Sequence, residues 1–353
     1  MKLGGLFGKG GGTAIGVDIG SHSVKVAEIT KRGGKHVLTN YGIAKLLTDA
    51  IVDGEVMDRE VVVDTIRDLM ESKGIAGTDV ATAVSGRAVI VKKILVDRLP
   101  PNEASEAIYL EAEHHIPFGI DDVYLDYQVL RDTDAKSPDK MEVLLVAAKR
   151  EMVDAHVALL QDAGFMPRIV DVDAFAVQNA YEANTTPQEG ETVLLMNVGA
   201  SVTNLNIVRD GIPLFTRDIW IAGNTFTEQI QKRLSVNREQ ALATLTAEGA
   251  ENSTELAEIV ATICEDLAVG VERSVSFLKS SGEAEKIDRI VLAGGSSRIP
   301  GLLSALAERH AVSVEVGNCL ARVAYADGLF TGEDLELLAP QLTVAVGLAL
   351  RTR

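Results

Sequence analysis

Cysteines and long apolar segments are scarce in this sequence. Only two of the 353 residues are cysteine, Cys264 and Cys319, and they do not form a C-x-x-C pair. We therefore expect two free, buried thiols rather than a disulfide or a structural zinc site. No apolar run reaches the roughly 18 residues that a membrane-spanning helix needs, and the first residues lack the apolar core of a signal peptide. These absences predict a cytoplasmic protein.

Positive charge is also scarce. The sequence has 34 lysines and arginines against 51 aspartates and glutamates, which gives a formal net charge of −17. Nucleic acids and anionic lipids are negatively charged, so the composition argues against a protein that binds either of them broadly. Hydrophobic residues make up 46% of the chain. A chain of this length and composition can build two or more globular cores.

The first informative motif is a predicted strand, tight turn and strand over residues 15–29. Gly20 lets the backbone approach a ligand closely, and Ser21, Ser23 and nearby backbone N–H groups can converge on an anion. Asp18 at the strand end is suited to hold a hydrated Mg²⁺ beside phosphates. For this motif alone, an ordinary hairpin whose Asp and Ser only satisfy the turn is the alternative.

A second hairpin of the same kind is predicted over residues 193–208. A strand again reaches a polar residue, Asn197, and then a glycine and small or hydroxyl residues, which are Gly199, Ala200, Ser201 and Thr203. Asn197 lies about half a chain length after Asp18. This spacing suggests two similar α/β halves, each offering a hairpin tip to a shared cleft.

A third motif follows a predicted strand that begins near Arg289. The strand leads into Gly294, Gly295, Ser296, Ser297 and Arg298, and Pro300 is expected to open a helix. The two glycines leave room for a flat ring against the backbone, and a helix N-terminus nearby favours phosphate. Taken alone, this motif is also compatible with a plain strand-to-helix loop.

Together and in this order, the three motifs resemble the phosphate-1, phosphate-2 and adenosine motifs of the actin, heat-shock chaperone and hexokinase superfamily. Within it, the sequence most resembles the PilM family of type IV pilus assembly proteins, which are relatives of the cell-division protein FtsA. This narrower resemblance rests on residues 17–25, 111–118, 123–130 and 339–351, and it extends over nearly the whole chain from Thr13. It implies an α/β fold of the two-lobed actin-like (ribonuclease H-like) type with an FtsA-like inserted subdomain.

The resemblance also implies a domain organisation. After a flexible tail at 1–12, we expect a first core subdomain (1A) at 13–85 and 166–189, with the FtsA/PilM-type subdomain inserted at 86–165. The second core subdomain (2A) is expected at 190–223 and 286–353, and a smaller subdomain (2B) at 224–285. Among the helices, we expect one capped by Asp58, one capped by Asn102 that runs through His115, and a last one from about Leu342.

By the same resemblance, ATP and Mg²⁺ are expected in the cleft between the lobes. Asp18 would hold Mg²⁺ through water. The residues implied to bind nucleotide are Asp18, Gly20, Ser21, Ser23 and Lys25 in the first hairpin, Asn197, Gly199, Ala200, Ser201 and Thr203 in the second, Gly223, Glu228 and Lys232 near the base and ribose, and Gly294, Gly295, Ser296 and Arg298 in the third motif.

Two residues bear on whether ATP would be hydrolysed. The family places an acidic or amide residue near the γ-phosphate water, and Asp173 falls at the matching position. Asp173 is therefore a candidate general base, and Asp18 is the second candidate catalytic residue. An aspartate at position 173 would also be explained if it only capped its own helix. Related proteins usually have aspartate where this sequence has Asn197, and an amide carries no charge to support Mg²⁺. We therefore expect a nucleotide-binding scaffold that is at most a weak ATPase.

The function implied by the resemblance is that of a cytoplasmic adaptor in type IV pilus assembly and twitching motility. In PilM-like proteins, the groove between the inserted subdomain and the first core half receives the cytoplasmic N-terminal peptide of the membrane protein PilN. The adaptor would then lie at the inner membrane through its partners and connect them to the cytoplasmic motor. The alternatives are an FtsA-like self-assembling ATPase scaffold, including a homo-oligomer or ring, and a small-molecule kinase of the same superfamily.

Overall fold

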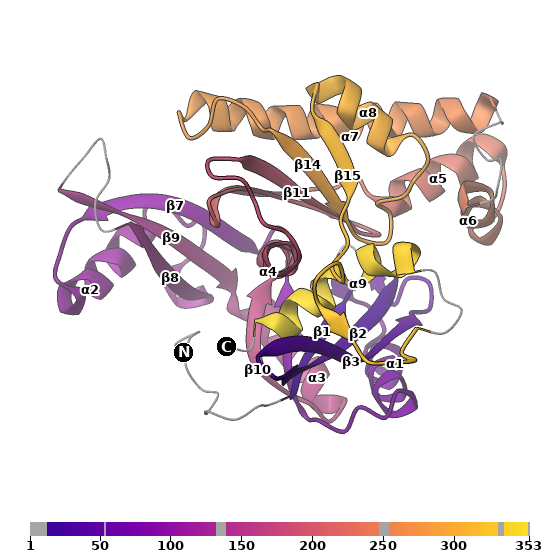
Figure 1. The fold of residues 1–353 in the computed structure, drawn as a ribbon, viewed down its shortest axis with the longest axis horizontal. Helices are drawn as coiled ribbons and strands as arrows, with labels where there is room; N and C mark the ends of the chain where they lie inside the picture. Colours follow the sequence, from indigo (N-terminus) through magenta and orange to yellow (C-terminus); the bar gives the residue numbers. More distant parts are fainter. Residues whose placement is uncertain (1–12, 53, 132–138, 247–253, 331–334, 352–353) are drawn as a thin grey trace.

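The computed structural model describes residues 13–52, 54–131, 139–246, 254–330 and 335–351. The chain forms two core lobes, each with its own sheet, and a third, smaller sheet that extends to one side (Figure 1). Within these described ranges, no helix is both long and apolar enough to cross a membrane.

The first lobe is built on a six-stranded sheet whose centre is the first predicted hairpin. Antiparallel pairing places Asp18 opposite Lys25, and two further strands extend the sheet in parallel beyond β1. The strand order is β10 (Met166–Val172), β6 (Asp79–Val84), β1 (Thr13–Ile19), β2 (Ser23–Arg32), β3 (Lys35–Lys45) and β16 (Ala324–Tyr325). A short hairpin of β4 (Ile51–Val52) and β5 (Glu55–Val56) follows β3 in the chain.

Helices α1 (Arg59–Ser72) and α3 (Arg150–Asp162) pack on one face of this sheet. The side chain of Asp58 accepts a hydrogen bond from the backbone N–H of Val61, as the predicted cap requires. Val62, Ile66 and other apolar residues of α1 are buried against the strands. The amphipathic pattern of this segment therefore forms the expected helix.

The second lobe is built on a five-stranded sheet that contains the second predicted hairpin, formed by β11 and β12. Its order is β13 (Ile212–Ile219), β12 (Thr203–Arg209), β11 (Thr192–Val198), β14 (Arg289–Ala293) and β15 (Ser313–Val316). The outer face is covered by a largely apolar core. The helices that contribute to this core are α5 (Gly223–Leu234), α6 (Arg238–Thr246), α7 (Thr254–Ser280) and α8 (Leu302–His310).

Helices α4 (Asp173–Asn184) and α9 (Leu335–Leu350) lie between the two sheets (Figure 1). One buried cluster joins residues of β6 to residues of β11, β12 and β14 through these two helices. The packing is close, since a Cβ on Gly347 would overlap the backbone of Ala176, and a Cβ on Gly16 would overlap the carbonyl oxygen of Ala345. The two lobes therefore share one central helical layer.

The third sheet has the order β7 (Val89–Asp97), β9 (Lys140–Lys149) and β8 (Val123–Arg131). Helix α2 (Pro101–Ala112) packs on one face of it and forms a separate small core, and the short 3₁₀ helix η1 (Ile120–Asp122) precedes β8. We call residues 86–149 the inserted unit, which ends before the predicted boundary at 165, because α3 packs in the core of the first lobe. It follows β6 of the first lobe in the chain and carries its own apolar core.

Helices α2 and α8 do not begin as predicted. Helix α2 begins at Pro101 and ends at Ala112, and Pro100 occupies the cap position in place of the predicted Asn102. The earlier start is explained by Pro101, because proline is well suited to the first helical position. Helix α8 begins at Leu302, after Gly301 with a φ of 81°, so Pro300 precedes the helix instead of opening it.

The C-terminal region also differs from the expected division. Helix α9 begins at Leu335 instead of Leu342. It packs against β1, β2 and α4, and β16 pairs with β3 of the first sheet. β16 and α9 therefore belong to the first lobe, so the predicted assignment of all of 286–353 to the second core subdomain is wrong for these two elements.

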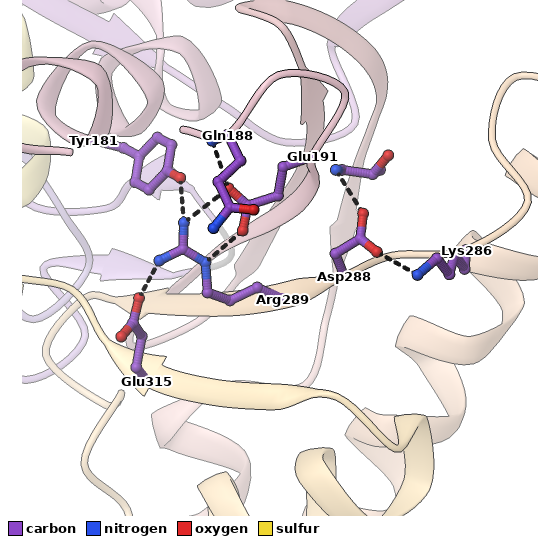
Figure 2. A network of polar contacts seen from close by, with 8 residues as sticks. Tyr181, Gln188, Glu191, Lys286, Asp288, Arg289 and Glu315 are labelled. Carbon is purple, nitrogen blue, oxygen red and sulfur yellow. Dashed lines mark hydrogen bonds and ion pairs between the residues drawn. The ribbon is translucent and has the colours of Figure 1, made fainter. Parts of the chain in front are cut away.

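A polar network fixes α4 to the second sheet at the end opposite the hairpin tip (Figure 2). The guanidinium of Arg289 on β14 donates to the hydroxyl of Tyr181 on α4 at 2.8 Å. It also pairs with Glu191 at 3.1 Å and with Glu315 on β15 at 2.8 Å. Asp288 beside it accepts a hydrogen bond from the backbone N–H of Thr192 and pairs with a lysine. One arginine thus joins α4, the segment before β11, β14 and β15.

We expect Arg289→Ala to lower the free energy of unfolding by about 2 kcal/mol, because Glu191 would stay largely buried without its cation. Urea denaturation followed by circular dichroism measures this loss. The control is Arg168→Ala, since Arg168 pairs with Asp79 at 3.1 Å where both side chains are about half exposed. That pair should contribute less than about 1 kcal/mol. Equal losses in the two variants would contradict the role given to Arg289.

Candidate functional site

A cavity of about 1760 Å³ lies where the tips of both predicted hairpins meet the loop after β14. Most of the site residues predicted from the sequence line this one cavity. They are Asp18, Gly20, Ser21, Ser23, Lys25, Asp173, Asn197, Gly199, Ala200, Ser201, Gly223, Gly294, Gly295, Ser296 and Arg298.

Three predicted residues do not line the cavity. Thr203 is buried, and its hydroxyl donates to the carbonyl oxygen of Ile221 at 2.7 Å. Glu228 and Lys232 occupy exposed positions on α5. Phe226 and Ile230 carry the buried face of α5, whereas Glu228 lies one helical turn after Asn224, which lines the cavity, so the nucleotide role of Glu228 and Lys232 stays a prediction.

In the first hairpin, the backbone is closed by a hydrogen bond from the N–H of Gly20 to the carbonyl oxygen of Ser23 at 3.1 Å. The ammonium group of Lys25 lies 2.9 Å from Oδ2 of Asp18, and each side chain is 13% exposed. This pair results directly from the β1–β2 register. It presents one positive and one negative charge side by side in the cavity wall.

The second hairpin is supported by the start of α5. The N–H groups of Gly223 and Asn224 donate to the carbonyl oxygens of Gly199 and Ala200 at 3.1 and 2.7 Å. The side-chain amide of Asn224 donates to the hydroxyl of Ser201 at 3.0 Å. The hairpin tip and the beginning of α5 are therefore held as one unit.

The third motif is fixed to both the second hairpin and α9. Gly294 has a φ of 91°, and a Cβ there would overlap the carbonyl oxygen of Val198. Its N–H donates to the carbonyl oxygen of Pro340 at 2.8 Å. Pro340 has no N–H for the carbonyl of Glu336 one turn earlier, and the guanidinium of Arg298 donates to that oxygen at 2.8 Å. This contact explains how α9 continues through a proline.

Asp173 is not the cap of its helix. Val172 occupies the cap position without a side-chain hydrogen bond, and Asp173 is the first residue of α4. Burial raises the pKa of Asp173 to about 7, and the negative charges of Asp18 and Asp218 add to this effect. A hydrogen bond with Ser85 and the charge of Lys25 act in the opposite direction. A carboxyl group with this pKa can accept a proton near neutral pH.

A histidine that the sequence analysis did not single out lies in the cavity wall. Nε2 of His156 on α3 lies 2.8 Å from the hydroxyl of Thr82, which itself donates to the carbonyl oxygen of Val17 at 2.9 Å. The hydroxyl proton is thereby used, so His156 carries its proton on Nε2. Burial lowers the pKa of His156 to about 4 despite the nearby charge of Asp18, which keeps the ring neutral.

Several cations in the cavity wall were also missed by the sequence analysis. Lys45 and Arg238 both line the cavity, and Arg238 donates to the side-chain oxygen of Asn224 at 2.7 Å. The pKa of His22 is lowered first by burial and then by the charges of Lys45, Arg238 and Lys25. No spacing relates these residues in the sequence. The fold thus gathers positive charge in one cavity of an acidic protein.

The metal-binding side chains in the cavity suit only a metal ion that keeps most of its water ligands. Among the described residues, no three His, Cys, Asp or Glu side chains gather to hold a metal ion. Asp18 is the carboxylate at the tip of the first hairpin, where it pairs with Lys25, and the other carboxylates in the cavity lining are Glu55, Glu151, Asp173 and Glu239. Mg²⁺ commonly keeps several waters and takes one or two carboxylates together with phosphate oxygens. The cavity therefore fits a hydrated Mg²⁺ that arrives with a phosphate ligand.

Comparison with known proteins agrees with this geometry. A family model described as type IV pilus assembly protein PilM matches residues 16–353. A solved structure of a PilM-PilN type IV pilus biogenesis complex is similar with a TM-score of 0.84 and 28% sequence identity, covering 96% of this chain and 98% of that chain.

Two more distant structures support the fold alone. Ethanolamine utilization protein EutJ from Carboxydothermus hydrogenoformans has a TM-score of 0.58 at 14% identity, covering 96% of this chain and 89% of that chain. MreB 5 of Spiroplasma citri bound to AMPPNP has a TM-score of 0.54 at 10% identity, covering 95% of this chain and 94% of that chain. The predicted actin-like fold is confirmed, and the chain belongs to the PilM family of type IV pilus assembly proteins.

Proposed function

We propose that the chain is the actin-like ATP-binding component of a type IV pilus assembly complex, and that it binds the cytoplasmic N-terminal peptide of PilN. The observation that carries the nucleotide part is the convergence of two glycine-tipped hairpins and the Gly294-Gly295 loop on one cavity. The partner is supported by the similarity to a structure in which PilM is in complex with PilN.

In this proposal, the phosphates of ATP lie between the hairpin tips. Backbone N–H groups around Gly20 and Gly199, together with the hydroxyls of Ser21 and Ser201, offer donors to anionic oxygens. Lys25 and Arg238 add positive charge to the same wall. Asp18 would hold Mg²⁺ through water, and the ion would neutralise part of the phosphate charge when bound.

The base would lie against the third motif. Gly295 has no heavy atom within 4 Å of the position of a Cβ, so the open space beside it can accept a flat ring. The adenosine role of Glu228 and Lys232 stays a prediction, since both are exposed on α5 and follow Asn224, which lines the cavity, by one and two helical turns. Gly223 and Ser296 remain candidates because both line the cavity.

Binding is favoured over turnover in this site. Asp173 has the pKa of a general base, but Asn197 supplies no negative charge to the metal. Phosphoryl transfer depends mainly on positioned charge, so we propose that hydrolysis is slow at most. The main role of ATP would then be to stabilise one arrangement of the two lobes.

The PilN peptide would bind at the junction of the inserted unit and the first lobe. Tyr124 on β8 reaches across this junction, and its hydroxyl donates to Oδ1 of Asp154 on α3 at 2.8 Å. Its ring also lies 4.3 Å from the guanidinium of Arg150 and is 38% exposed. An exposed aromatic group with a polar end is a common anchor in protein interfaces. Through PilN, the chain would lie on the cytoplasmic side of the inner membrane and connect it to the motor.

The nucleotide site is tested by a graded series at Gly295. Gly295→Ala adds one carbon and should weaken ATP binding slightly, whereas Gly295→Val should weaken it more than about tenfold by filling the space for the base. Both variants should keep the wild-type free energy of unfolding, since the added atoms meet open space. Isothermal titration calorimetry with ATP and Mg²⁺ measures the dissociation constants. Wild-type affinity in Gly295→Val would exclude this position for the base.

The general base is tested by single-turnover hydrolysis. Asp173 can accept a proton only when it is ionised, so the rate should rise tenfold per pH unit below about pH 7 and level off above it. Asp173→Asn should lower the rate about 100-fold or more and remove this pH dependence, while AMPPNP binding persists. An unchanged rate and pH profile in the variant would rule out Asp173 as the base.

The peptide site is tested with two matched tyrosines. Tyr124→Ala should weaken binding of the PilN N-terminal peptide about tenfold without changing the dissociation constant for ATP. Tyr109→Ala is the control, because Tyr109 lies on α2 of the same unit and is 44% exposed. Fluorescence anisotropy with a labelled peptide measures both. If the two variants weaken binding equally, or neither does, the junction at Tyr124 is not the peptide site.

A further inference from the structure

A chain of hydrogen bonds runs from the cavity wall to the root of the inserted unit. The side-chain amide of Asn197 donates to Oδ1 of Asn204 at 2.9 Å. The amide of Asn204 donates to Oδ1 of Asp218 at 2.8 Å. The other oxygen of Asp218 accepts the backbone N–H of Gly86 at 2.6 Å. Gly86 lies between β6 of the first lobe and β7 of the inserted unit, whereas the other three residues belong to the second lobe.

The order of donors and acceptors in this chain is fixed from one end. An ionised carboxylate only accepts hydrogen bonds, and both oxygens of Asp218 are engaged. Asn204 must therefore turn its amide nitrogen toward Asp218 and its oxygen toward position 197. Only a hydrogen-bond donor at position 197 can pair with this oxygen of Asn204, and the side-chain amide of Asn197 supplies one. An aspartate at 197 would place two acceptors against each other, so Asn197 is matched to its neighbours in this chain.

Two further contacts attach the inserted unit to the second lobe. The guanidinium of Arg87 lies 4.7 Å from the centre of the Trp220 ring. The ammonium of Lys93 on β7, which is 13% exposed, forms an ion pair with Glu283 of the second lobe and lies 3.6 Å from Glu142. The inserted unit thus continues from the first lobe in the chain but is held by side chains of the second. A movement of one lobe against the other must move this unit or break these contacts.

We propose that the Asn197–Asn204–Asp218–Gly86 chain, together with the Lys93–Glu283 ion pair, couples occupation of the cavity to the position of the inserted unit. Asp218 is then a positioning residue for partner binding, although it does not line the cavity. This inference rests on the proposed function, since it connects the ATP site to the peptide site. A ligand shifts an equilibrium between two positions of the inserted unit only if it makes different contacts in each of them. Asn197 can provide such a contact, because it lines the cavity at the end of the hydrogen-bond chain that a phosphate ligand would reach.

The test measures the dissociation constant of the PilN N-terminal peptide for the full chain, without nucleotide and with saturating AMPPNP and Mg²⁺. The ratio of the two constants is the coupling, and in the wild type we expect it to differ from one by about fivefold or more. The affinity for AMPPNP, measured with and without peptide, must change by the same factor.

Asp218→Asn should bring this ratio to within about twofold of one. The variant replaces one acceptor oxygen with an N–H donor, which faces a donor from Asn204 or Gly86 unless Asn204 and Asn197 both turn their amides over. Either outcome removes the donor that Asn197 presents to Asn204 in the wild type or breaks the chain at Asp218. Each ligand measured alone should bind within about threefold of wild type. Asp288→Asn is the matched control, because Asp288 also accepts a backbone N–H, from Thr192, but at the opposite end of the second sheet. It should keep the wild-type ratio.

Glu283→Gln provides a second variant that removes only the charge of the other link, at a partly exposed side chain. It should reduce the ratio and leave folding intact, so it decides the matter if Asp218→Asn does not fold. A wild-type ratio in either folded variant would overturn the proposal. If the wild type binds both ligands with a ratio of one, the proposal fails and the proposed function stands. If the wild type does not bind AMPPNP, the proposed function fails and the coupling with it.

Discussion

The close packing of α4 and α9 between the two core sheets is the constraint on which the site depends. Gly16 and Gly347 let these helices approach the strands and each other with backbone atoms in contact. One buried cluster extends from β6 through both helices to β11, β12 and β14. Because the sheets share this layer, the β1–β2 and β11–β12 tips face a single cavity from opposite sides. The Arg289 network fixes α4 to the other end of the second sheet. The hairpin tips therefore lie at the end of the sheet that is opposite this network.

The parts of the site that depend on local turn chemistry could be predicted from the sequence. Asp18, Gly20 and Ser21 share one hairpin tip, and their side chains and backbone fix its shape within a few residues. The predicted starts of α2 and α8 were wrong, because a proline or a glycine determines where each helix begins, as at Pro101 and Gly301. The extension of α9 could not be predicted, because Arg298 supplies from a distant loop the hydrogen bond that Pro340 cannot make. Lys45 and Arg238 were missed for the same reason, since only the fold brings them together.

The charges in the cavity suit the capture of an anion better than its rapid hydrolysis. The chain has a net charge of −17, yet this cavity is lined by more lysines and arginines, among them Lys25, Lys45, Arg238 and Arg298, than by aspartates and glutamates. Asp173 is held with a pKa of about 7 by burial and by neighbouring carboxylates. Asn197 uses its amide within a chain of hydrogen bonds that leads to Gly86. The departure from aspartate at this position thus has a structural reason, and it agrees with the proposal that nucleotide binding outweighs turnover.

The central claim is that hairpin tips from two lobes hold one nucleotide between them. Hydrogen exchange of the full chain, with and without AMPPNP and Mg²⁺, tests it most directly. We expect the backbone amides at 20–23 and at 199–202 to become protected together, at the same nucleotide concentration. Protection of only one tip, or of neither while the nucleotide is bound, would contradict the account.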